Sequence, residues 1–131
     1  MLRTILLTLL ASVLAFVVDA LIGFAGLRFT HVPKGFPPFT LLPILSGAVG
    51  GAILASITYA AIQAVSKQPD KVFLFVAVAA LALSFALPLR LSFTKSARFA
   101  GVTPSAQMVL VLMHTVVATV TVATLLAKPD R

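Results

Sequence analysis

The chain has 131 residues, of which 60% are hydrophobic and 10% are charged, and its mean hydropathy is +1.14. Soluble domains carry about 25% charged residues, so this composition excludes an ordinary water-soluble domain. Cysteine is absent, which excludes disulfides, thiolate metal sites and cysteine nucleophiles. The net charge of +7 comes from basic residues that stand singly at the ends of apolar runs, which indicates anchors among lipid headgroups and no nucleic-acid partner.

The first two predicted membrane spans cover residues 4–27 and 41–65. Asp19 is the only charged residue of the first span, and the second span has none. A cleaved secretory signal peptide ending near Ala20 is an alternative for the first span, but the apolar stretch continues to Leu27. The loop between the spans contains three prolines, which remove backbone donors and fix φ, so we expect no helix to continue through it.

The third predicted span, residues 72–89, follows a tight polar turn and is expected to form an antiparallel hairpin with the second. Asp70 is placed to cap the N-terminus of this helix, and Pro88 lies at its far end. The fourth span, residues 105–127, follows Thr103, an N-cap residue with proline after it. The connection before Thr103 suits the headgroup level and predicts a short interfacial helix. Its basic and aromatic residues are Arg90, Phe93, Lys95, Arg98 and Phe99.

Four spans in a chain of this length predict an all-α fold. We expect an integral membrane four-helix bundle with antiparallel neighbouring helices, forming one domain over residues 1–131. The even number of spans places both termini on one side of the membrane. The ten Lys and Arg residues divide equally between the two sides, so the positive-inside rule does not choose an orientation. The short turn and tails favour termini in the cytoplasm.

Three motifs occur in a characteristic order along the chain. Phe36-Pro37-Pro38 enters a Gly-rich second span, Leu-Ala-Leu-Ser lies at 81–84, and Leu-Val-Leu-Met-His lies at 110–114. Together they resemble a family of short bacterial four-helix membrane proteins catalogued as a domain of unknown function, over nearly the whole chain. The resemblance implies the four-helix topology and a bacterial origin, and hence the plasma membrane of a bacterial cell. It implies no activity, substrate or catalytic residue.

Asp19 is the most informative residue, because an ionisable side chain inside a span costs roughly 3 kcal/mol on insertion scales. It lies on a helical face of small and polar residues that we expect to face the bundle. The other members of this face are Thr8, Ser12, Ala15, Gly23 and Gly26. His114 lies at a similar depth, roughly 12 to 14 Å from the same membrane surface. Ser84 is expected to bond first to its own helix, and it can join Asp19 and His114 in an intramembrane polar centre.

Several interpretations of this polar centre stay open. A hydrogen bond or ion pair between Asp19 and His114 would fix the helix register. A proton-accepting site is the second, because burial favours a neutral carboxyl and imidazole titrates near neutral pH. In the third, the two side chains do not meet. On the second span, Gly47, Gly51 and Ala55 form a small-xxx-small series that favours close helix packing, within the bundle or against a second copy or partner.

No catalytic, cofactor-binding or metal-binding residue is predicted. The chain has no cysteine or glutamate, and its two histidines lack a ligand spacing, which argues against zinc. Phosphate loops, serine elbows and paired carboxylates are missing from the sequence. Asp19, Ser84 and His114 are the residue types of a hydrolytic triad, but a triad is defined by a geometry that the sequence does not show.

The favoured hypothesis is a non-enzymatic membrane protein with a structural or accessory role. Its partners would be the lipid bilayer and either a second copy or another membrane protein. The alternative is a small dimeric proton-linked transporter or channel that uses Asp19. Four short helices, one intramembrane acid and balanced loop charge are also features of small multidrug transporters with dual topology. The chain has Asp where they have Glu, and it lacks tryptophan.

Overall fold

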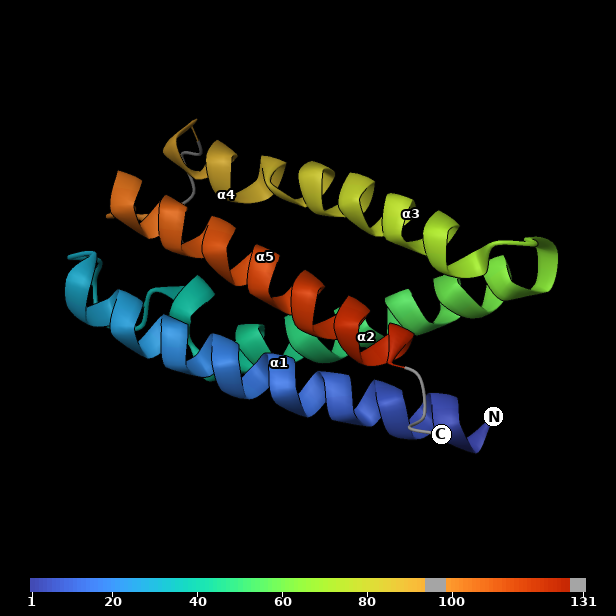
Figure 1. Cartoon of the computed structure of the whole chain (residues 1–131). Coiled ribbons are helices and arrows are strands. Elements are labelled where there is room, and N and C mark those ends of the chain that lie inside the picture. The colour runs from blue at the N-terminus through green and yellow to red at the C-terminus, as the bar shows by residue number, and fades with distance from the viewer. Residues whose placement is uncertain (94–98, 128–131) are drawn as a thin grey trace.

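The computed structural model describes residues 1–93 and 99–127, and this part of the chain consists of helices and short connections, with no strand. Figure 1 shows the helices as one bundle. The elements are α1 (Leu2–Phe29), η1 (Pro37–Phe39), α2 (Leu41–Val65), α3 (Pro69–Ser84), α4 (Ala86–Arg90), η2 (Leu91–Phe93) and α5 (Pro104–Leu126). Four helices are long and apolar enough to cross a membrane when α3 and α4 are taken as one crossing. The predicted all-α membrane bundle is therefore confirmed.

Neighbouring helices run in opposite directions, as the colour gradient shows (Figure 1). α1 packs against both α2 and α5, while α2 and α3 meet at their shared turn and diverge away from it (Figure 1). The Arg3 guanidinium donates a hydrogen bond to the carbonyl of Ala127, which holds the beginning of α1 beside the end of α5. The divergence of α2 from α3 leaves the centre of the bundle open on that side.

The inward face of α1 is the small-residue face predicted from helical spacing. Its buried residues are Ala11, Ser12, Ala15, Asp19, Gly23 and Gly26. The packing is close near the loop end, because a Cβ on Gly26 would lie 3.1 Å from the Phe39 ring and 3.2 Å from Val109 and would require these side chains to shift. The opposite faces expose large apolar side chains such as Leu9 and Val13, as helices in contact with lipid do.

α2 packs on α1 through a face one position along from the predicted small-residue series. The buried residues of α2 are Ile44, Ala48, Ala52 and Ser56. Ile44 reaches Gly23 of α1, and the Ser56 and Thr8 hydroxyls are hydrogen-bonded at 2.6 Å. These two contacts turn Gly47 and Gly51 away from α1.

The α2–α3 turn is closed by a contact of Asp70, the residue that the sequence predicted to cap α3. Gln68 is the N-cap residue of α3 and Pro69 follows it, so Asp70 lies inside the first turn and makes no capping hydrogen bond. The Tyr59 hydroxyl donates to the Asp70 carboxylate at 2.6 Å, and the Tyr59 ring lies 4.7 Å from that of Phe73. The prediction that Asp70 caps this helix is wrong, because its carboxylate is used between helices.

The third crossing is broken near its end, where the sequence predicted one continuous helix to residue 89. Pro88 has no N–H, and its ring crowds the carbonyl four residues earlier, so α3 ends at Ser84 and α4 begins at Ala86. The side-chain amide of Gln107 donates to the carbonyls of Pro88 at 2.9 Å and Leu89 at 3.3 Å, which fastens α4 to α5.

The start of α5 follows the sequence prediction. The Thr103 hydroxyl oxygen accepts a hydrogen bond from the backbone N–H of Ala106 at 3.2 Å, which confirms Thr103 as the N-cap. The same hydroxyl donates to the Thr30 carbonyl at 2.8 Å and so ties this cap to the end of α1. Of the basic connection before it, Lys95 and Arg98 lie outside the described residues.

Candidate functional site

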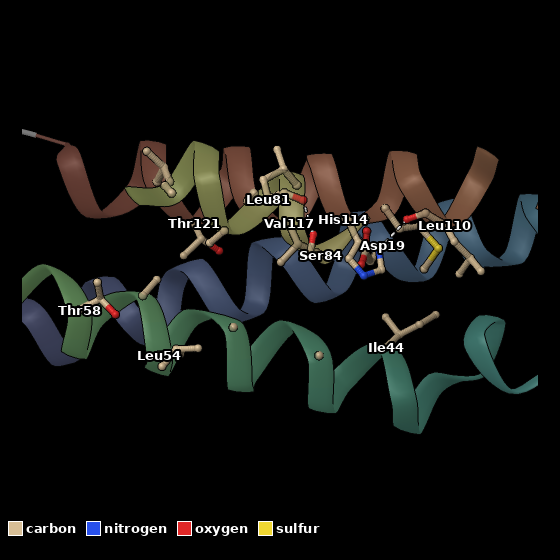
Figure 2. A pocket seen from close by; sticks show the side chains of 18 of the residues that line it. Asp19, Ile44, Leu54, Thr58, Leu81, Ser84, Leu110, His114, Val117 and Thr121 are labelled. Carbon is tan, nitrogen blue, oxygen red and sulfur yellow. Dashed lines mark hydrogen bonds between the residues drawn. The ribbon is translucent and has the colours of Figure 1, made fainter. Parts of the chain in front are cut away.

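A cavity of about 560 Å³ lies where α2 and α3 diverge. α5 forms its floor, Asp19 is contributed by α1, and Pro38 of η1 borders it. Most of its wall is apolar, and Figure 2 shows Asp19, Ser84 and His114 close together, with Thr121 and Thr58 farther toward the other end of the cavity. These polar lining residues are Asp19, Thr58, Ser84, His114 and Thr121.

Two buried polar atoms of the cavity lining have no hydrogen-bond partner among the described residues. They are Oδ1 of Asp19 and Oγ1 of Thr121. The two side chains are only 6% and 3% exposed. A buried polar atom left unpaired costs about 1–3 kcal/mol, so native structures seldom keep one without a compensating use. Both residues line the same cavity.

His114 is held by its own helix. Its Nδ1 lies 2.7 Å from the carbonyl oxygen of Leu110. A carbonyl only accepts, so Nδ1 carries the hydrogen, and in the neutral ring Nε2 is left as an acceptor. The imidazole lines the cavity together with Asp19 (Figure 2).

Ser84 is also tied to its own helix, as predicted. Its hydroxyl donates to the Leu81 carbonyl at 2.7 Å (Figure 2). The structure thus brings Asp19, Ser84 and His114 to one cavity, but no hydrogen bond or ion pair joins any two of them within 1–93 and 99–127. The three side chains line the cavity, and two of their acceptors, Oδ1 of Asp19 and Nε2 of His114, are not used in hydrogen bonds with one another.

The polar centre lies near the middle of the long apolar helices. Asp19 is ten residues before Phe29 at the end of α1, and His114 is ten residues after Pro104 at the start of α5. At 1.5 Å per residue, both lie about 15 Å from that end of the bundle, or half the thickness of a hydrocarbon core. A ligand at this centre would therefore lie at the depth of the hydrocarbon core and be surrounded by protein.

The small-residue series of α2 lines the same cavity. Gly47, Gly51 and Ala55 all border it. No atom lies within 4 Å of a Cβ placed on Gly47, and at Gly51 the nearest is a Val117 methyl at 3.9 Å. The prediction that these residues pack closely against another helix therefore remains a prediction, and it applies to a helix of a second copy or of another protein. Within the chain, their small size gives the cavity its width.

Comparison with known families matches residues 1–131 to the model of a family of unknown function, DUF6069. The chain belongs to this family. The resemblance inferred from the sequence motifs is thereby confirmed, and DUF6069 carries no assigned activity. Comparison with curated proteins and with solved structures finds no match. The functional argument for this DUF6069 chain therefore rests on the cavity.

Sequence reasoning missed part of this DUF6069 cavity. Thr121 lies two helical turns after His114, so the same spacing that placed His114 inward also indicated Thr121. Its lack of a partner was not visible, because the sequence did not show that α2 and α3 separate. Thr58 was missed for the same reason.

A second cavity of about 630 Å³ adjoins the first near the loop end of the bundle. Its lining includes Arg90, Phe93 and Phe99, which the sequence placed at the headgroup level. Pro38, Leu110 and His114 border both cavities, so His114 stands on the wall between them.

Proposed function

We propose that this multi-pass membrane protein is non-enzymatic and binds an amphiphilic small molecule inside the bilayer. The polar group of the ligand contacts Asp19, and its apolar part fills the cavity between α2, α3 and α5. Such binding is the first step required by the transporter hypothesis from the sequence. We place the protein in the bacterial plasma membrane with its termini in the cytoplasm.

One observation carries this proposal: Asp19, whose Oδ1 has no hydrogen-bond partner among the described residues, lines a cavity whose walls are mostly apolar. A side chain kept only to fix the helix register would have its hydrogen-bonding atoms paired with another helix, as the Thr8 and Ser56 hydroxyls are. The cavity volume of about 560 Å³ falls within the range of roughly 300–1,000 Å³ that is typical of small-molecule sites.

The hydrogen bonds of the polar centre favour binding over catalysis. The Ser84 hydroxyl donates to Leu81, away from His114, so the imidazole does not activate it. The His114 Nδ1–H is donated to Leu110, which leaves no contact through which Asp19 would orient the ring. Among the described residues, no three His, Cys, Asp or Glu side chains are grouped to hold a metal ion.

The proposal is tested by filling the cavity. Gly47 and Gly50 both have open space around their Cβ positions, but only Gly47 lines the cavity. We expect at least one of decylammonium, decanol and decanoate to raise the thermal unfolding midpoint of the wild type in lipid nanodiscs. Gly47→Phe should abolish this shift and Gly50→Phe should keep it. An equal response of both variants, or no shift with any probe, would contradict the proposal.

A structural or accessory role is the second candidate, favoured by the uncovered glycines of α2. An added Cβ at Gly47 or Gly50 meets no atom within 4 Å, so a helix from a second copy or another membrane protein can approach closely there. We commit to a second copy for the test, because the chain has no cysteine and single-cysteine variants are unambiguous.

We expect Gly50→Cys to form a cross-linked dimer under mild oxidation in the membrane. Leu21→Cys is the control, since Leu21 is 66% exposed on α1 and lies at a similar depth, about 12–14 Å from the loop end of its helix. A dimer band on denaturing gels at Gly50 alone supports the interface, because a disulfide requires Cα atoms within about 7 Å. Equal bands at both positions indicate random collision and contradict it.

A further inference from the structure

We infer that the ligand is a lipophilic primary ammonium compound whose N–H groups donate to the Asp19 carboxylate and to Nε2 of His114. The inference rests on the proposed binding function and names its ligand class. Three features of the cavity support it: the hydrogen-bond acceptors of its wall, the charge of its lining, and the shape of its apolar part.

The polar centre of the cavity presents acceptors. Asp19 offers carboxylate oxygens, one of them without a partner. His114 offers Nε2, because its Nδ1–H is already donated to Leu110. Ser84 has donated its only hydrogen to Leu81, so its oxygen can only accept. A ligand that satisfies this group must bring several donors on one atom, and a primary ammonium carries three N–H donors.

The charge of the lining selects a cation. Asp19 is the only Asp, Glu, Lys or Arg among the described residues that line the cavity. The chain as a whole carries a net charge of +7. A cation is therefore attracted at the cavity and repelled by most of the remaining protein surface. The low dielectric at membrane depth strengthens the attraction between an ammonium and a carboxylate.

Asp70, the second acidic residue in the described part of the chain, does not compete with Asp19 for the ammonium group. Asp70 lies in the first turn of α3 and accepts a hydrogen bond from Tyr59. It is absent from the cavity lining. The Asp19 carboxylate is thus the acid to which an amphiphilic cation has access from inside the bundle.

The apolar part of the cavity fits an alkyl tail. From His114 the lining continues along α5 past Val117 and Ala118 to Val122, and α3 adds Val76, Ala77 and Ala80 opposite. His114 and Thr121 are two helical turns apart, or about 10 Å. A tail of medium length therefore extends from the ammonium at Asp19 toward the α2–α3 turn, against side chains that are mostly aliphatic and include the Thr58 and Thr121 hydroxyls.

The experiment measures binding of three probes with the same tail and different heads: decylammonium, decyltrimethylammonium and decanol. The protein is purified and placed in nanodiscs of zwitterionic lipid, and dissociation constants are measured by calorimetry at neutral pH. For the wild type we expect decylammonium to bind about tenfold more tightly than decanol, a difference equivalent to about 1.4 kcal/mol. Decyltrimethylammonium should lose most of this advantage, because it carries no N–H donor.

Two variants separate a specific contact from partitioning into lipid. Asp19→Asn should bring the preference for decylammonium over decanol close to one, and its circular dichroism spectrum checks that the variant is folded. Asp70→Asn makes the same chemical change outside the cavity and should keep the wild-type preference.

The outcomes distinguish this inference from the function on which it rests. Equal binding of decylammonium and decanol to the wild type overturns the ligand class and leaves the amphiphile-binding function standing. Equal binding of decylammonium and decyltrimethylammonium overturns the N–H donation. A preference that survives in Asp19→Asn overturns the role of Asp19. If none of the three probes binds, the ligand class is overturned, and the amphiphile-binding function is overturned with it when decanoate also fails to raise the unfolding midpoint.

Discussion

Asp19→Leu is expected to stabilise the ligand-free protein while removing the contact that holds the polar group of the ligand. Leucine has the same branching as aspartate, so it can occupy the space of the carboxyl at the edge of the cavity. The substitution removes a buried oxygen with no partner, and the free energy of unfolding should rise by about 1–3 kcal/mol. The higher helix propensity of leucine adds up to roughly 0.7 kcal/mol.

The measurement is unfolding of the purified protein by denaturing detergent, with and without decylammonium. Asp19→Asn is the matched control, because it removes the charge and keeps an unpaired polar group, so it should gain less stability than Asp19→Leu. The direction of the change discriminates between hypotheses. A protein that uses Asp19 as the structural centre of its bundle would lose stability on substitution with leucine, and that result would remove the basis for a binding site.

The α1 side of the fold was predictable because one helix carries one continuous small-residue face. Large residues on the other faces of α1 cannot approach a neighbouring helix as closely as Ala15 or Gly23 can, so helical period alone identified the buried side. On α2 the small residues are spread around the helix, and period alone could not choose a face. The choice is made by Ile44 against Gly23 and by Ser56 against Thr8, both of which depend on the partner helix.

The sequence predicted which residues come together in the candidate site, but it did not predict which hydrogen bonds they make. Helical spacing and depth brought Asp19 and His114 to the same level of the bundle. Whether they bond depends on competition with local carbonyls, and His114 uses the carbonyl of Leu110 one turn earlier. The break before Pro88 and the separation of α2 from α3 create the space between them. The separation depends on how the helices pack against one another, which no pattern in one helix reveals.

Gly26→Leu is expected to destabilise the protein strongly, whereas the same change at Gly50 should have little effect. Even a single Cβ at position 26 would lie 3.1 Å from the Phe39 ring and 3.2 Å from Val109, so a leucine side chain must displace one of them. Overpacking of this kind costs typically about 1–3 kcal/mol and occasionally more. Gly50 has open space around it and faces lipid, where leucine is well accommodated.

Comparing the two glycines separates close packing from a general intolerance of bulk in these helices. The free energy of unfolding is measured for each variant in dilute detergent, where contacts with a second copy do not contribute. Gly26 supports the packing of Phe39, and the η1 turn carries Pro38 at the border of both cavities. Displacing Phe39 should therefore also weaken amphiphile binding. If Gly26→Leu unfolds with the wild-type free energy, the close approach of η1 to α1 is wrong, and with it the position of Pro38 beside the cavities.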